Sequence, residues 1–138
     1  MALYYDLPVF KDVYQLILKI FDYTKDFPRE YKFTLGQDLK RDGINLVRSI
    51  YRANKSKEKT PYLEAFLDDF ELVKLELRLC ADMKLLPLKK HAELSELMNR
   101  IGKQITAWRN SQAICNHSAT IVLPAKLIFL CSCFPRFY

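Results

Sequence analysis

Glycine is scarce in this chain, with only three among 138 residues. A fold of many short β-strands needs glycine at its tight turns, so this scarcity argues against an all-β architecture. Apolar residues make up half of the sequence, which favours a folded globular protein over a disordered one. The length suits one domain that can bury a core of its own.

The sequence also lacks a long uninterrupted hydrophobic run. The best candidate, residues 121–130, contains Pro124 and Lys126 and falls short of the ~20 apolar residues that a membrane helix needs. Residues 1–27 mix apolar and charged positions and show no apolar core or cleavage site of a signal peptide. We therefore expect a cytoplasmic protein whose four cysteines are free thiols rather than a disulfide framework.

Catalytic patterns are missing as well. The two histidines are His91 and His117, and His91 lies with Glu93 near a predicted helix start, where a surface position is expected. There is no glycine-rich phosphate loop, no nucleophile elbow and no Glu-x-x-His pair of the kind that metal-binding bundles carry. We therefore expect a protein that is not an enzyme and that uses no cofactor or metal.

What the sequence does contain is four helical patterns, in which apolar residues recur at spacings of three and four. They predict helices over residues 8–27, 34–54, 60–86 and 88–111. The linkers between them are short, and short connections favour antiparallel neighbours. We therefore predict an all-α fold, an up-down-up-down antiparallel four-helix bundle over residues 1–112, followed by a hydrophobic tail over residues 113–138.

Proline and threonine mark the predicted helix ends. Pro8 and Pro61 suit the first turn of a helix. Pro28 should stop the first helix, because the residue before a proline is pushed away from helical angles. Thr34 and Gln37 have the spacing of a capping box at the start of the second helix.

Apolar faces are predicted for each helix. The stripe of the first consists of Phe10, Val13, Tyr14, Ile17, Phe21 and Thr24. The stripe of the fourth consists of Leu94, Met98, Ile101, Ile105 and Trp108. Gly43 lies on the apolar face of the second helix and indicates either a close neighbouring helix or a simple defect.

The third helix has two apolar stripes rather than one. The first comprises Leu63, Phe66, Phe70, Val73, Leu77 and Cys80. The second, about 120° or more away at 100° per residue, comprises Leu72, Leu75, Leu79, Met83 and Leu86. An outer helix of a monomeric bundle should have one apolar face, so another subunit or the C-terminal tail should cover the second. Of the two, we favour an oligomer interface.

The second helix carries a basic stripe on the side opposite to its apolar face. On a helical wheel this stripe is about 60° wide and holds no acidic residue. It consists of Arg41, Arg48, Arg52 and Lys55, and Lys57 and Lys59 extend it into the next loop. With a net charge of +6, such a stripe can follow a phosphate backbone, although a solvated outer face would look the same.

On the third helix, Lys74 and Arg78 are four residues apart and point the same way. Glu71 and Asp82 can each pair with one of them, so a surface charge network is one reading. On the fourth helix, charges of both signs mix at helical spacing, which is typical of a solvated face. These residues are Lys89, Glu93, Glu96, Arg100 and Lys103.

Four segments in order, and at the right separations, resemble the accessory variability determinant (Avd) family of diversity-generating retroelements. They are residues 27–36, 46–54, 72–82 and 101–108. A sister group, encoded by intervening sequences of bacterial 23S ribosomal RNA genes, carries a Pro-Asn-Ile-Ala-Glu-Gly-like run in the second helix. Ser49-Ile-Tyr-Arg-Ala-Asn54 stands in that place here, which favours the retroelement group.

The resemblance implies a non-enzymatic accessory subunit. Such proteins form a ring-like homopentamer, bind the reverse transcriptase of the retroelement and contact its template RNA, and the complex makes mutagenised cDNA. The family's third helix carries a basic pair that supports reverse-transcriptase binding, and Lys74 and Arg78 fall on it. Lysine at the first place departs from an arginine pair and would weaken a forked contact. The alternatives are a ribosomal-intervening-sequence-type bundle and a purely structural oligomer.

The tail lies outside the family pattern. It is apolar, has no acidic residue and contains three of the four cysteines. Cys115, His117, Cys131 and Cys133 could be imagined as a zinc set, but their spacings are tighter than usual. A strand-like extension packed on the bundle and a poorly ordered end are the readings that we favour.

Overall fold

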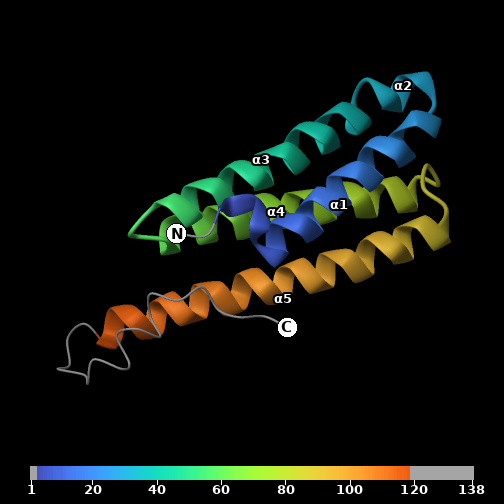
Figure 1. The fold of residues 1–138 in the computed structure, drawn as a ribbon. Helices are drawn as coiled ribbons and strands as arrows, with labels where there is room; N and C mark the ends of the chain where they lie inside the picture. The colour runs from blue at the N-terminus through green and yellow to red at the C-terminus, as the bar shows by residue number, and fades with distance from the viewer. Residues whose placement is uncertain (1–2, 119–138) are drawn as a thin grey trace.

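The computed structural model describes residues 3–118, and the regular elements in that range are all helical. Four long helices, α1, α3, α4 and α5, run lengthwise along the molecule (Figure 1). Their bounds are Pro8–Tyr23, Leu35–Lys55, Thr60–Asp82 and Leu88–Ser118. Three short elements complete the set, η1 (Tyr4–Asp6), η2 (Thr24–Asp26) and α2 (Arg29–Lys32). The predicted four-helix bundle is confirmed.

Each long helix packs against two others. α1 and α4 lie on opposite sides of the bundle, and each contacts both α3 and α5. Side-chain pairs show the direction of the α1–α5 contact, because Asp12 meets Arg100 at 3.1 Å and Lys19 meets Glu93 at 3.3 Å. Residue numbers rise along one helix as they fall along the other, so these two helices are antiparallel.

The core is formed where the four apolar stripes meet. The predicted stripe of α5 is buried throughout, and so is the first predicted stripe of α4. The largest fully buried side chains are Trp108, Phe66 and Phe70. Removing such apolar area from water is the main favourable term in folding, at roughly 25 cal/mol per Å².

The buried face of α1 differs from the prediction. Its buried residues are Val9, Val13, Leu16 and Ile20, together with Thr24 just beyond the helix. Tyr14 and Phe21 are 49% and 39% exposed, because their row lies at the edge of α1 that faces α3 rather than at its centre. The apolar arc of α1 is therefore wider than its buried face. The predicted stripe contains the buried Val13 and Thr24, but it also includes the exposed Tyr14 and Phe21 and leaves out Leu16 and Ile20.

Several helix ends also differ from the prediction. The Thr34 hydroxyl donates to the carbonyl of Glu30 at 2.9 Å, so the capping box with Gln37 does not form. α1 ends at Tyr23 in a 3₁₀ turn, four residues before the predicted end. α5 continues to Ser118 instead of ending near Ser111, because no glycine or proline follows until Pro124.

The end of α4 changes the assignment of one interface residue. Lys84 adopts a left-handed backbone conformation with φ 59°, and the amides of Leu85 and Leu86 donate to the carbonyl of Cys80 at 2.9 and 3.2 Å. This turn folds Leu86 into the core, where it is 5% exposed. Leu86 was therefore wrongly predicted as part of the second, outward-facing stripe.

Gly43 lies where α1 approaches α3. A Cβ atom built on it would meet Ile17 Cγ1 at 3.6 Å and Ile20 Cδ1 at 3.7 Å, which are ordinary contact distances. The neighbouring helix predicted from this glycine is α1. An alanine there would contact α1 without forcing it away.

Two carboxyl groups are buried together between α3 and α4. Asp42 of α3 is 6% exposed and is held by Arg41, whose Nε and Nη2 donate to its two oxygens at 2.9 and 3.3 Å. Glu76 of α4 is 7% exposed, and its Oε2 receives no hydrogen bond from any group in the described range. Burial, the nearby charge of Asp42 and a hydrogen bond to Asp42 together raise the pKa of Glu76 to about 7.

This raised pKa makes stability depend on pH. Between pH 4.5 and about 7, the unfolded chain loses the Glu76 proton while the folded chain keeps it. The free energy of unfolding should therefore fall over this window and level off above it. Glu76→Gln should remove that fall and stabilise the protein at pH 8 by on the order of 1–3 kcal/mol.

Urea unfolding at pH 5 and pH 8, followed by circular dichroism, measures this effect. Glu96→Gln is the matched control, because Glu96 is exposed on α5. If the Glu76→Gln protein shows the same pH dependence of the free energy of unfolding as the unmodified chain, protonation of Glu76 is not the cause of that dependence.

Candidate functional site

The basic stripe runs along α3 from Arg41 to Lys55 and continues into the loop that leads to α4, the helix that follows α3 in Figure 1. Arg48, Arg52, Lys55 and Lys57 are all exposed there. None of the four forms an ion pair within residues 3–118, and Lys55 Nζ lies 5.9 Å from the Tyr51 ring centroid. These side chains therefore form a positively charged surface that is open to an anionic partner.

Arg41 differs from the rest of the stripe. Its guanidinium is held by Asp42 and by Asp38, whose Oδ1 lies 2.9 Å from Nη1. On the helical wheel neither Asp38 nor Asp42 falls in the stripe, but both carboxylates are close enough along α3 to reach the guanidinium of Arg41. In this structure Arg41 mainly neutralises Asp42 beside the buried Glu76.

Lys59 has a structural contact of its own. Its Nζ donates to the carbonyls of Ala53 and Ser56 at 3.2 and 2.6 Å, and the carbonyl of Asn54 lies at 3.5 Å. These carbonyls end α3, so the ammonium group caps the helix and opposes its negative end. Burial lowers the pKa of Lys59 from its usual value. Of the six predicted cations, Arg48, Arg52, Lys55 and Lys57 form the open set.

An apolar groove runs beside these cations, between α1 and α3. Its volume is about 460 Å³. It is lined by Tyr4, Phe10, Tyr14, Ile17, Ile44, Val47, Arg48 and Tyr51. Sequence reasoning missed this groove because it assigned the α1 row to the core. The available signal was the spacing of Ile44, Arg48, Tyr51 and Lys55, which places all four on one face of a helix.

The predicted basic pair of α4 lines a second groove, between α4 and α5, of about 460 Å³. Lys74 pairs with Glu71 and lies over the Phe70 ring, 4.9 Å from its centroid. Arg78 pairs with Asp82 at 3.2 Å. The structure thus brings Lys74 and Arg78 together along one groove, and it confirms the predicted surface ion pairs.

Four residues of the second α4 stripe are exposed. The exposed fractions of Leu72, Leu75, Leu79 and Met83 are 44%, 55%, 42% and 43%. They follow one another at spacings of three and four, so they form a continuous apolar row on the outside of the bundle. Leu86 does not belong to this row, because the turn at the end of α4 folds its side chain into the core.

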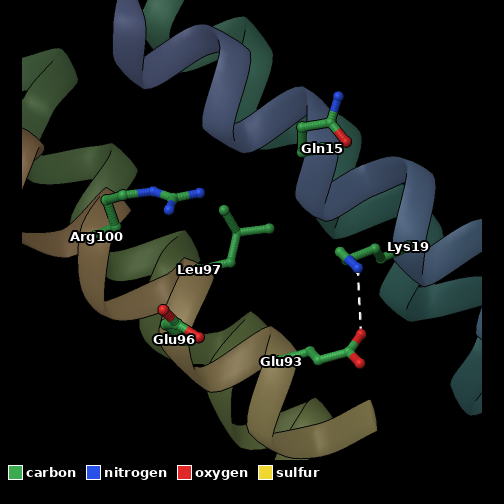
Figure 2. A pocket seen from close by; sticks show the side chains of 6 residues that line it. All are labelled: Gln15, Lys19, Glu93, Glu96, Leu97 and Arg100. Atoms are coloured by element: carbon green, nitrogen blue, oxygen red, sulfur yellow. Dashed lines mark hydrogen bonds and ion pairs between the residues drawn. The ribbon is translucent and has the colours of Figure 1, made fainter.

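The seam between α1 and α5 is polar and balanced in charge. Figure 2 shows Lys19 and Glu93 pointing toward each other across it. The Tyr23 hydroxyl also donates to Glu93, at 2.7 Å, and the hydrogen bonds from Tyr23 and Lys19 lower the pKa of this carboxyl. Glu93 and Arg100 thus tie α5 to α1, whereas the sequence predicted only a solvated face.

Over residues 3–118 no three side chains come together as metal ligands. None of the helices in that range combines the length and the apolar character that a bilayer-spanning segment needs. Cys80 is buried, which raises the pKa of its thiol to about 11 and disfavours the reactive thiolate. In the imagined zinc set, the side chains of Cys115 and His117 are not described, and Cys131 and Cys133 lie outside the described residues.

Comparison with known proteins gives one match. The model of the bAvd-like family matches residues 9–112, which include all four long helices except the first residue of α1 and the end of α5. No curated protein and no solved structure matches. The match covers most of the chain and contains the four segments that carry the resemblance.

Proposed function

Because the chain belongs to the bAvd-like family, we propose that it is a non-enzymatic accessory subunit of a diversity-generating retroelement. In this role it binds the reverse transcriptase and template RNA of the retroelement and supports mutagenic cDNA synthesis. The family match over residues 9–112 is the observation that carries the proposal. Three surfaces of the bundle are available for the three contacts that this role needs.

The RNA contact is assigned to the open cations of α3 and the following loop. Arg48 and Arg52 are four residues apart, so their side chains lie one helical turn from each other. Arginine can hold a phosphate with two hydrogen bonds, and Lys55 and Lys57 add point charges next to it. The absence of ion pairs at these four cations within the described range supports this assignment.

The reverse-transcriptase contact is assigned to the groove between α4 and α5. Lys74 and Arg78 lie along one side of it, and His91 and Ser95 come from the other helix. Their partners Glu71 and Asp82 are exposed, and exposed ion pairs contribute little to stability. Both cations can therefore exchange an internal acid for an acidic group of a partner at small cost.

The subunit contact is assigned to the exposed row of Leu72, Leu75, Leu79 and Met83. A contiguous apolar row on the outside of a small protein is typical of a protein–protein interface. It lies away from the buried face of α4, and Leu75 at its edge also lines the groove with α5. We propose a homo-oligomer with this row in its interface, and a pentamer is the form that the family resemblance implies.

Reversing the charge of Arg48 and Arg52 tests the RNA contact. Arg48→Glu with Arg52→Glu should weaken RNA binding at least tenfold and make the dependence of log affinity on log salt shallower by about one to two units, because fewer counterions are released. Fluorescence anisotropy across a salt series measures both. Arg29→Glu with Lys89→Glu makes the same change in net charge away from the stripe. Equal weakening by the two variants would contradict the assignment.

Removing the basic pair of α4 tests the reverse-transcriptase contact. Lys74→Ala with Arg78→Ala should abolish co-purification of the reverse transcriptase after nuclease treatment, while leaving the mass of the oligomer unchanged. Arg48→Ala with Arg52→Ala is the control, since it removes another exposed basic pair four residues apart. Full retention of the enzyme by the α4 variant would show that the pair is not the contact.

Placing charge on the apolar row tests the oligomer. Leu75→Glu with Leu79→Glu should lower the mass measured by light scattering to the 16.3 kDa of one chain, from about five times that value. Phe33→Glu with Leu88→Glu places the same charges on exposed apolar positions outside the row and should leave the oligomer intact. An unmodified chain that is already monomeric would exclude the interface.

A further inference from the structure

The groove between α1 and α3 is an aromatic surface that remains half open. Tyr14 and Tyr51 are 49% and 44% exposed, although both line the groove. Tyr4 holds the wall in place, because its ring packs edge-on against Tyr51 and Phe10 at centroid distances of 5.4 and 5.3 Å. Phe10 in turn stacks on Tyr14 at 6.0 Å. The rings are thus fixed by one another while part of each faces solvent.

Cations alternate with these apolar side chains. On α3, Ile44, Arg48, Tyr51 and Lys55 follow one another at spacings of four, three and four, so they share one exposed face about 16 Å long. Arg48 itself lines the groove, between Ile44 and Tyr51. Farther along the same seam, Lys40 lies 5.3 Å from the centroid of the Phe21 ring.

The charge of this groove distinguishes it from the others. None of its eight lining residues is acidic, and Arg48 is the one charged group among them. The groove between α4 and α5 contains Glu71, and the seam between α1 and α5 contains Glu93 and Glu96. A ligand with flat apolar faces and regularly spaced negative charges is complementary to the α1–α3 groove and is disfavoured at the other two.

Single-stranded nucleic acid has this chemistry. Its unpaired bases offer aromatic faces and its backbone offers a phosphate at every nucleotide, whereas a duplex hides the faces of its bases. We propose that the α1–α3 groove binds unpaired nucleotides of RNA or DNA. Bases stack on Tyr14 and Tyr51 while Arg48 and Lys55 hold the flanking phosphates. This inference rests on the proposed RNA contact and narrows it to unpaired segments.

Truncating the two rings tests the inference. Tyr14→Ala with Tyr51→Ala should weaken binding of a short oligouridine about tenfold or more, since each stacked base contributes on the order of 1–3 kcal/mol. The slope of log affinity against log salt should stay the same, because no phosphate contact is lost. Affinity for a duplex of equal length should change less than twofold. An oligothymidine of the same length separates RNA from DNA as the preferred strand.

Two control variants accompany this measurement. Tyr14→Phe with Tyr51→Phe should keep single-strand affinity, because stacking needs the ring and not the hydroxyl. Phe33→Ala removes a ring that is 65% exposed outside the groove, so it should have no effect. Circular dichroism and light scattering on each variant establish that fold and mass are unchanged.

The inference is overturned if truncating the rings leaves single-strand affinity unchanged or weakens duplex binding equally. A fall in oligomer mass would instead identify the groove as a contact between copies of this chain, and loss of the reverse transcriptase alone would identify a protein site. If Arg48→Glu with Arg52→Glu weakens binding and the ring variant does not, the RNA contact stands and the groove assignment fails. If the unmodified chain binds no nucleic acid, both fail.

Discussion

Burial of one face of α4 against α3 and α5 is the constraint on which the other surfaces depend. Phe66, Phe70 and Val73 are fully buried, so the rotation of α4 about its axis is fixed by the core. With that rotation set, the exposed leucine row must face outward, and Lys74 and Arg78 must lie along the α5 side.

The contact between α3 and α4 also contains a group that lowers the stability of the fold, the carboxyl of Glu76. Glu76 lies between α3 and α4 beside Asp42, and a buried carboxyl without a donor costs stability unless it keeps its proton. Arg41 pairs directly with Asp42 and Asp38, and its charge only partly opposes the rise in the pKa of Glu76. The surrounding apolar contacts of α4 must therefore offset the cost of burying Glu76.

The long stripes of α4 and α5 could be read from the sequence because spacing alone reports which side of a long helix is buried. The α1 stripe could not, since its apolar arc is wider than the face that α3 and α5 cover. Leu86 was misassigned because a non-glycine residue, Lys84, takes the left-handed turn that ends α4. The capping contact of Lys59 and the rings of the α1–α3 groove depend on how segments far apart in the sequence meet, which spacing within one helix does not report.

The central claim is that RNA binds the α1–α3 side of the bundle. Ultraviolet cross-linking of unmodified RNA to the full chain, followed by mass spectrometry of the cross-linked peptides, tests it most directly. Direct cross-links should fall on peptides that contain Tyr14 or residues 44–57. Cross-links confined to α4 and α5 would contradict the claim, because they would place RNA on the surfaces that we propose for protein contacts.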